Sequence, residues 1–410
     1  MSNSKIILSA LIALCVFSFF GFISTTLMAV VMLPIVFAFC VYDAAHYSTY
    51  QKAIRFSGAD YCFIILCVVE LICCANSIYK PNSESVALKI LIITILYFFV
   101  RAFVTHAIQI RYLCSVITCF AAVLAAITLL FFIFHAQKYS ELGSLEQYKG
   151  FYRPFGMLSN DWATVLLCLM PFSAISMLNA NGKKTVLLAA ANCLIIISIL
   201  VSFSRGAYLS LALFVIASIS FSALLKQGLF RRTIFLFSAI TVLAFALTLP
   251  VAGSVATTIR MNKTVSQQKS VEGRLTKYTE ALELFKRQPL LGVGGGNYTL
   301  AVERYCNAGQ NDIFSPRCTN TYLQLLAERG IVGFCVYAAL FVAVLLIVFR
   351  RARRGNVDAG ILLSAILALM FREVTFSSFF EVDSIPLLFT LMCLIATNDY
   401  KDGEYEIFKH

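Results

Sequence analysis

The chain has 410 residues, of which 60% are hydrophobic and 13% charged, and its formal net charge is +12. Its mean hydropathy of +0.83 implies far more apolar surface than a soluble fold of this size can bury, which excludes a soluble protein. We therefore expect an all-α integral membrane protein, with lipid as the solvent for most of its surface.

Apolar runs recur along the chain, and each approaches the length of about 20 residues that a helix needs to cross a bilayer. They predict about twelve transmembrane helices. The first run lacks a small-x-small cleavage site and a second follows at once, so we interpret the pair as a retained hairpin and not as a signal peptide. The predicted spans are 6–22, 24–42, 60–77, 86–105, 112–134, 162–179, 185–203, 206–225, 233–252, 331–349, 358–376 and 383–398.

Two long loops interrupt the series of predicted transmembrane helices. Residues 1–252 form the first nine predicted helices, with an outer loop at 135–161. Residues 253–330 form a large, partly helical periplasmic loop between the ninth and tenth helices. Residues 331–398 hold the last three helices, and 399–410 form a cytoplasmic tail. Long connections in compact proteins often carry function, so we expect the site in these two loops.

Basic residues in alternate short connections predict the orientation. Every connection on one side is basic, whereas those on the other side are poorer in Lys and Arg or too long to count. We expect a bacterial inner-membrane protein with both termini in the cytoplasm. The basic residues on the predicted inner side are Lys52, Arg55, Arg101, Arg111, Lys183, Lys184, Lys226, Arg231, Arg232, Arg350, Arg351, Arg353 and Arg354.

The large loop is predicted to contain an amphipathic helix over 272–287. Leu275, Tyr278, Leu282 and Phe285 fall on one face of it, with charges elsewhere. We expect this helix to lie on the bilayer surface.

Turn signals follow this helix. Pro289 and the glycines after it predict its end, and Thr319 or Asn320 offers an N-cap for a next helix that Gly330 closes. The glycines at 292–296 follow a helix and not a strand, so they do not predict a nucleotide site. We interpret them as a tight turn that lets the backbone approach the membrane or a ligand.

Two of the 14 cysteines, Cys306 and Cys318, lie in the large loop. An oxidising periplasm would permit a disulfide between them. Spacing alone does not fix the distance between their Cα atoms, so a bridge and two free thiols both remain open.

Arginines in the outer loop point to an anionic partner. Residues 260–329 hold ten Lys or Arg against six Asp or Glu. Arginine binds phosphate through two parallel hydrogen bonds, which fits a lipid-linked diphosphate; contact with lipid headgroups is the alternative. Arg205 stands in a short connection between two apolar runs, where a charge is costly unless it has a partner or reaches the interface.

Four segments, in their order and spacing, resemble the O-antigen ligase and O-antigen polymerase superfamily. The resemblance implies an enzyme that takes a glycan from an undecaprenyl diphosphate carrier and transfers it to a hydroxyl group on the periplasmic face. It implies no cofactor, no metal and no nucleic acid, with membrane lipids as surroundings. The segments are YRPFGMLSND at 152–161, SFSRGAYLSL at 202–211, EGRLTKYTEALELFKRQPLLGVGGGNY at 272–298 and TNTYLQLLAERGIVGF at 319–334.

The resemblance assigns Arg205 and Arg274 to diphosphate binding and to stabilisation of the leaving group. Arg153 is a third candidate for substrate binding, because relatives carry an Arg-x-x-Gly stretch that ends in Asn. Asn160 or Asp161 would equally well cap the next helix.

The fourth segment departs from the pattern. Relatives have His-Asn where this chain has Thr319 and Asn320, and their histidine is thought to deprotonate the acceptor. We keep both residues as substrate-binding candidates, but a threonine hydroxyl cannot act as a base near neutral pH. His135 is the one histidine on the predicted outer face.

Acids near the last two spans are the other candidates for a base. Glu373, Glu381 and Asp383 all fall near the predicted periplasmic mouth. We favour Glu381 as the base and place Asp383 in the substrate-binding set. The alternative is that these acids pair with Arg372 or with loop arginines.

Three functions remain open. A polymerase would use the next lipid-linked repeat unit as acceptor, and a ligase would use lipid A-core; we favour the polymerase, because the missing histidine is associated mainly with ligases. A flippase or other transporter is the third. Transporters tend to show repeated halves and broken helices at mid-membrane, whereas this chain gathers its charges at one outer face.

Overall fold

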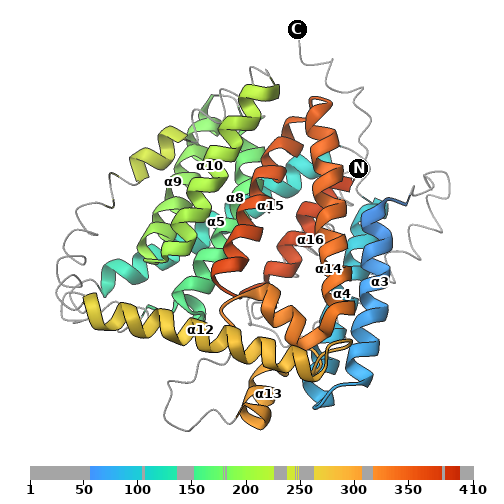
Figure 1. Cartoon of the computed structure of the whole chain (residues 1–410). Coiled ribbons are helices and arrows are strands. Elements are labelled where there is room, and N and C mark those ends of the chain that lie inside the picture. Colours follow the sequence, from blue (N-terminus) through green and yellow to red (C-terminus); the bar gives the residue numbers. More distant parts are fainter. Residues whose placement is uncertain are drawn as a thin grey trace.

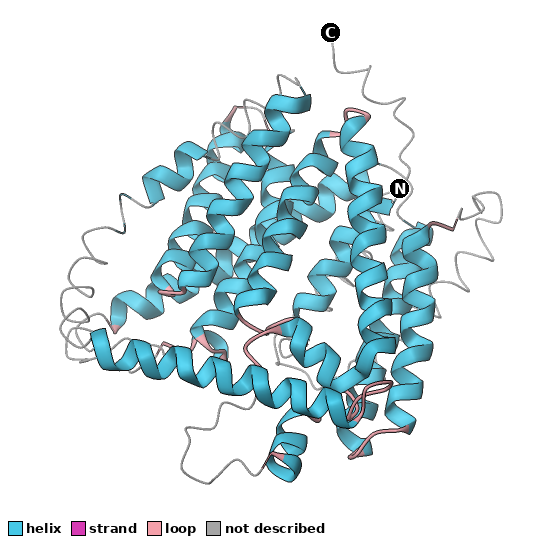
Figure 2. Ribbon diagram, in the orientation of Figure 1, coloured by secondary structure: helices cyan, strands magenta, loops and turns pink. Residues whose placement is uncertain are grey.

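The structure is a computed structural model of the chain. It describes residues 56–103, 107–135, 152–178, 180, 182–225, 238–244, 246, 248, 263–306, 317–380 and 384–397. Every regular element in these residues is a helix (Figure 2). The predicted spans 6–22 and 24–42 and most of 233–252 lie outside the described residues, as do Lys52, Arg55, Lys226, Arg231 and Arg232.

Nine predicted spans coincide with helices of the structure (Figure 1). Six of these helices, namely α3, α4, α5, α8, α9 and α14, are long and apolar enough to cross a membrane. The chain is therefore a multi-pass membrane protein that is all-helical in its described residues, and the total of twelve spans stays a prediction. The helices are α3 (Gly58–Ala75), α4 (Lys80–Phe103), α5 (Ala107–Phe134), α8 (Ser159–Leu178), α9 (Lys183–Val201), α10 (Arg205–Leu225), α14 (Thr321–Arg353), α15 (Val357–Thr375) and α16 (Ser384–Thr397).

Helix α8 lies at the centre of the bundle. It is 94% buried and packs against α5, α9, α10, α15 and α16. The apolar stretches of α3 and α14 are only 39% and 28% buried, which leaves side chains such as Ile64 and Val342 exposed. Apolar surface on this scale is stable when lipid covers it.

A glycine divides α14 into two limbs. Gly330 has φ 61° and separates an outer limb, 321–329, from a long limb, 331–353. A side chain there would be strained, and its Cβ would meet the Leu290 carbonyl at 2.3 Å. Gly330 ends the outer limb as predicted, and the spanning helix begins directly after it.

Helix α12 (Lys263–Arg287) lies across one end of the bundle, with the short α13 (Tyr298–Tyr305) beside it (Figure 1). The predicted amphipathic helix is therefore confirmed, although it begins earlier in the chain.

The buried face of α12 differs from the predicted one. Ala281 and Leu284 are 1% and 0% exposed and join an apolar cluster with α13. Leu275 and Leu282 are 58% and 41% exposed. The predicted apolar face is thus split, because α13 and α14 cover its neighbour and leave these leucines at the surface.

The glycine-rich turn after α12 lets the backbone approach another segment closely, and that segment is α14. Gly292 has φ 66°, and a Cβ there would lie 2.3 Å from the carbonyl carbon of Glu328. The N–H groups of Val293 and Gly294 donate to the carbonyl oxygens of Ala327 and Glu328 at 3.0 and 2.8 Å. The missing side chains let this turn form main-chain hydrogen bonds to α14.

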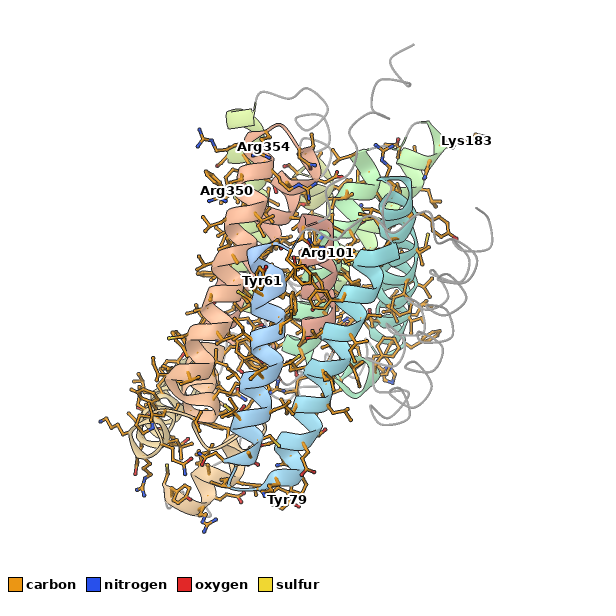
Figure 3. All side chains as sticks on the ribbon, turned by 90° about the vertical axis from the view of Figure 1, so that its right-hand side faces the viewer. Tyr61, Tyr79, Arg101, Lys183, Arg350 and Arg354 are labelled. Carbon is orange, nitrogen blue, oxygen red and sulfur yellow. The ribbon has the colours of Figure 1, made fainter. Side chains whose placement is uncertain are left out.

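Basic residues gather at the end of the bundle opposite α12. Figure 3 shows Lys183, Arg350 and Arg354 at that end and Tyr79 at the other. Arg101 lies inside α4 and not in a connection; it is 8% exposed and paired with Asp60.

Candidate active site

The outer limb of α14, the starts of α8 and α10 and the end of α15 meet at the end of the bundle that α12 crosses (Figure 1). Side chains from these segments form a connected polar region in an otherwise apolar bundle. Several of the residues that the sequence singled out, among them Arg205, Thr319 and Asn320, lie around it.

Arg372, near the end of α15, carries a buried charge and is 2% exposed. Its guanidinium donates to the hydroxyls of Thr164 and Thr375 at 3.1 and 3.2 Å. It also donates to the Asn160 carbonyl at 3.1 Å and to the Ser204 hydroxyl at 3.4 Å. All four acceptors are neutral, and no carboxylate among the described residues lies within ion-pair distance. A buried cation without an ionic partner is costly, so this position favours binding of an anion.

Arg205 begins α10 beside this guanidinium. Gly206 follows it, and a Cβ at Gly206 would lie 2.6 Å from Nη1 of Arg372 and 2.8 Å from Oγ1 of Thr375. The absent side chain therefore lets Arg372 pack against the first turn of α10. Arg205 is exposed. The N-terminus of α10 adds partial positive charge at the same place.

Arg317 is fixed by Asp161. Its Nη1 and Nη2 donate to Oδ1 and Oδ2 at 3.0 and 2.7 Å, and Nη1 also donates to the Ser377 carbonyl at 3.3 Å. The alternative interpretation was that Asn160 or Asp161 caps α8. The helix begins at Ser159, and the Asp161 carboxylate holds the large loop instead.

Helix α12 brings two more cations. Arg274 is exposed and Lys277 is half-buried. Burial lowers the pKa of Lys277; Cys318 and Glu280 oppose this effect, and the charges of Arg317 and Arg274 add to it. Arg274 also acts electrostatically on Arg372. We call Arg205, Arg274, Arg317 and Arg372 the arginine cluster.

Glu373 follows Arg372 but faces α14. Its Oε2 accepts hydrogen bonds from the Thr321 hydroxyl and, at 3.0 Å each, from the N–H groups of Ser378 and Phe379. Its Oε1 is buried and has no hydrogen-bond partner among the described residues. The alternative pairing of this acid with Arg372 is not found, because the two side chains form hydrogen bonds with different segments.

Asn320 caps α14. Its Oδ1 accepts from the N–H groups of Tyr322 and Leu323 at 2.9 and 3.1 Å, as one of the two predicted caps. The Thr319 hydroxyl is buried and has no hydrogen-bond partner among the residues that the structure describes. Both residues lie within three positions of Arg317 along the chain and so at the edge of the arginine cluster.

Arg153 is exposed and lies before a short 3₁₀ turn, Pro154–Gly156. The adjacent Tyr152 packs against Val201 and Phe203, in the turn before α10, which places Arg153 at the same end as Arg205. Glu381 and Asp383 lie outside the described residues.

Cys306 and Cys318 are free thiols in the structure and belong to one apolar cluster under α12. Burial raises the pKa of each thiol to about 11, so both are protonated near neutral pH. Thiol labelling before and after reduction would test for a bridge between them.

Sequence reasoning missed two members of the arginine cluster. Arg372 was considered only as a partner for acids, although a charge at the end of an apolar run is a functional signal in itself. Arg317 gives no such signal, because its partner Asp161 lies 156 residues away.

The helical bundle, with a connected polar region at one end, defines a multi-pass membrane protein. A family model described as O-Antigen ligase matches residues 190–338, a range that includes Arg205, Arg274, Arg317, Thr319 and Asn320. This match confirms the predicted resemblance to the O-antigen ligase and polymerase superfamily, whose members are glycosyl-transferring enzymes with lipid-linked glycan substrates. A search of curated proteins found no match to the chain.

Proposed function

We propose that this protein transfers a glycan from an undecaprenyl diphosphate carrier to a hydroxyl group of an acceptor, at the end of the bundle that α12 crosses. The observation that carries the proposal is the arginine cluster, in which the buried charge of Arg372 meets only neutral acceptors. Guanidinium groups match phosphate oxygens in charge and geometry. A cationic site at the mouth of a lipid-facing bundle fits an anion that is anchored in the membrane.

The exposed arginines Arg205 and Arg274 would contact the phosphate oxygens. When the bond from the anomeric carbon to the diphosphate breaks, negative charge grows on the leaving group, and fixed cations there lower the barrier. Arg372, whose guanidinium packs against Gly206, would add a further positive charge next to Arg205. Arg317, held by Asp161, fixes the loop at the edge of the site.

The distribution of charge supports an orientation. The end that carries Lys183, Arg350 and Arg354 would face the cytoplasm under the positive-inside rule. The α12 end would then face the periplasm of a bacterial inner membrane. Leu275 and Leu282 would rest on the bilayer surface.

Polymerase and ligase share this donor chemistry and differ in the acceptor. We favour the polymerase, with a lipid-linked repeat unit as acceptor, because Thr319 stands where ligases are most firmly associated with a histidine. Lipid A-core is the acceptor in the alternative.

Deletion of the gene in its host tests the proposal. Surface polysaccharide on a gel would be compared for wild type, deletion and complementation with Arg205→Ala, Arg274→Ala and Arg287→Ala. Arg287 is the matched control, because it lies on the same helix as Arg274 but pairs with Glu283. Loss of the ladder with one repeat on the core means a polymerase. Bare core with full-length glycan on the carrier means a ligase. Full activity of both Arg205→Ala and Arg274→Ala would contradict the assignment.

A further inference from the structure

The two carboxylate oxygens of Glu373 have different surroundings. Three donors, the Thr321 hydroxyl and the N–H groups of Ser378 and Phe379, all bind Oε2. Oε1 is buried and unpaired among the described residues. A carboxylate oxygen without a partner is costly in a dry place, so the arrangement needs a hydrogen-bond donor that the described residues do not supply.

A cavity of about 110 Å³ lies against this carboxylate, between the two limbs of α14, the end of α15 and residues 379–380. Glu373 is the one charged residue in its lining, which is otherwise largely aromatic and aliphatic, including Tyr322, Phe334 and Phe380. Pockets for small molecules combine an apolar lining with a few polar groups that orient the ligand. A sugar has that character, since its ring faces are apolar and its edges carry hydroxyl groups.

The position of the cavity relates it to the arginine cluster. Arg372 and Glu373 are successive residues, and Arg372 faces α8 and α10 while Glu373 faces α14. A diphosphate bound at the arginine cluster and a hydroxyl group bound at Glu373 would therefore approach the same end of α15 from different sides.

We propose that Glu373 is the general base that deprotonates the acceptor hydroxyl, and that the cavity between α14 and α15 receives the acceptor sugar. This inference rests on the proposed function. The hydroxyl donates to Oε1 of Glu373 and loses its proton to it. The hydroxyl oxygen forms the new bond to the anomeric carbon, and the bond from that carbon to the diphosphate oxygen breaks. The electron pair leaves with the diphosphate, and protonated Glu373 later releases its proton to water.

Two features of the chain agree with this role. Thr319 cannot act as a base, whereas a carboxylate can. Thr321, two residues further on, uses its hydroxyl to orient the carboxylate. The other acid favoured from the sequence, Glu381, provides the competing assignment, and the experiment compares the two.

The test uses the purified full chain in lipid nanodiscs, with lipid-linked repeat units extracted from the deletion strain as donor and acceptor. Glu373→Gln keeps a carbonyl oxygen for the three donors and removes the base. We expect transfer to fall at least about 100-fold, the scale of general-base catalysis. The acid limb of the pH–rate profile should disappear, while undecaprenyl diphosphate still raises the melting temperature as in wild type. Glu373→Asp and Glu381→Gln should both keep the acid limb, which would assign that limb to Glu373.

Other results would overturn the inference. One is a Glu373→Gln variant that transfers at the wild-type rate with its acid limb intact; another is loss of transfer in Glu381→Gln alone. Should Glu373→Gln fail to fold, the variant Thr321→Val tests the inference instead. It keeps the Glu373 carboxylate and removes one hydrogen-bond donor to its Oε2. An unchanged pH profile in that variant means that Glu373 only anchors the turn after α15, whereas a shifted acid limb supports the base. Failure of the proposed function looks different, because wild type itself would then transfer no glycan.

Discussion

Two buried arginines lie near the α12 end of the bundle, and they differ in whether their hydrogen-bond partners are charged or neutral. In the first group, Arg329 has two carboxylate partners, Glu70 at 2.5 Å and Glu328 at 2.8 Å, and the Tyr337 hydroxyl donates to Glu70 at 2.7 Å. In the second group, Arg372 has only neutral acceptors among the described residues. Both arginines are at most 2% exposed, so burial alone does not distinguish them.

We interpret the first group as a structural network and propose that the second is a binding site. Glu328 also accepts from the N–H groups of Gly296 and Tyr298 at 3.1 and 3.3 Å, so the first network fastens the glycine-rich turn to α14. Its cation, Arg329, is paired with two carboxylates of the chain. The arginine cluster has a surplus of cations that an anionic ligand would balance. The first network therefore stabilises the loop, whereas we propose that the arginine cluster binds an anionic substrate.

The largest effect on stability is expected for Arg329→Ala. The change leaves Glu70 and Glu328 buried without their cation, which costs about 3–5 kcal/mol when one member of a buried ion pair is removed. The melting temperature of the purified protein in detergent measures it. Adding Glu70→Gln and Glu328→Gln should recover much of the loss. An unchanged melting temperature in the single variant would show that this network does not hold the fold.

Arg372→Gln should separate activity from stability. Its present partners are neutral groups that a glutamine can also contact, so we expect a stability change within about 1 kcal/mol. Glycan transfer should fall at least about 100-fold, as when a group that stabilises developing charge is removed. Undecaprenyl diphosphate should raise the melting temperature of wild type but much less that of the variant. Destabilisation as large as that of Arg329→Ala would make Arg372 a structural residue.

Gly206→Ala should lower the transfer rate by displacing Arg372, with a smaller effect than Arg372→Gln. The added Cβ would meet Nη1 of Arg372 at 2.6 Å, so the guanidinium must move. We expect about a 10-fold loss of transfer, since small displacements of a positioning group are costly in rate. Gly273→Ala on α12 is the control, because a Cβ there meets nothing within 4 Å. Equal loss in both variants would contradict the role of Gly206.

The smallest effect is expected for Arg287→Ala. Its pair with Glu283 is exposed, with the two side chains 48% and 47% accessible. Exposed ion pairs contribute little, because water and salt screen them. Melting temperature and transfer rate should both stay at wild-type values within error. A clear loss of transfer would extend the functional surface along α12 to its C-terminal end.

Local pattern predicted much of the architecture. Nine helices could be located because long apolar runs are a property of contiguous sequence. The amphipathic helix over 272–287 and the cap at Asn320 followed from local spacing and side-chain chemistry in the same way. Arg205 and Arg274 could be named because charges at such positions stand out against an apolar background.

Only the tertiary structure decided which charges are matched. Arg317 meets Asp161 across 156 residues, Arg372 meets Ser204 across 168 and Arg329 meets Glu70 across 259. Tertiary contacts also decided which face of α12 is buried and which oxygen of Glu373, a residue that lines the cavity, is left unpaired. The sequence by itself determined where helices form, because that depends on neighbours along the chain. The fold determined which buried charges lack a partner, because that depends on side chains that meet only when distant helices pack.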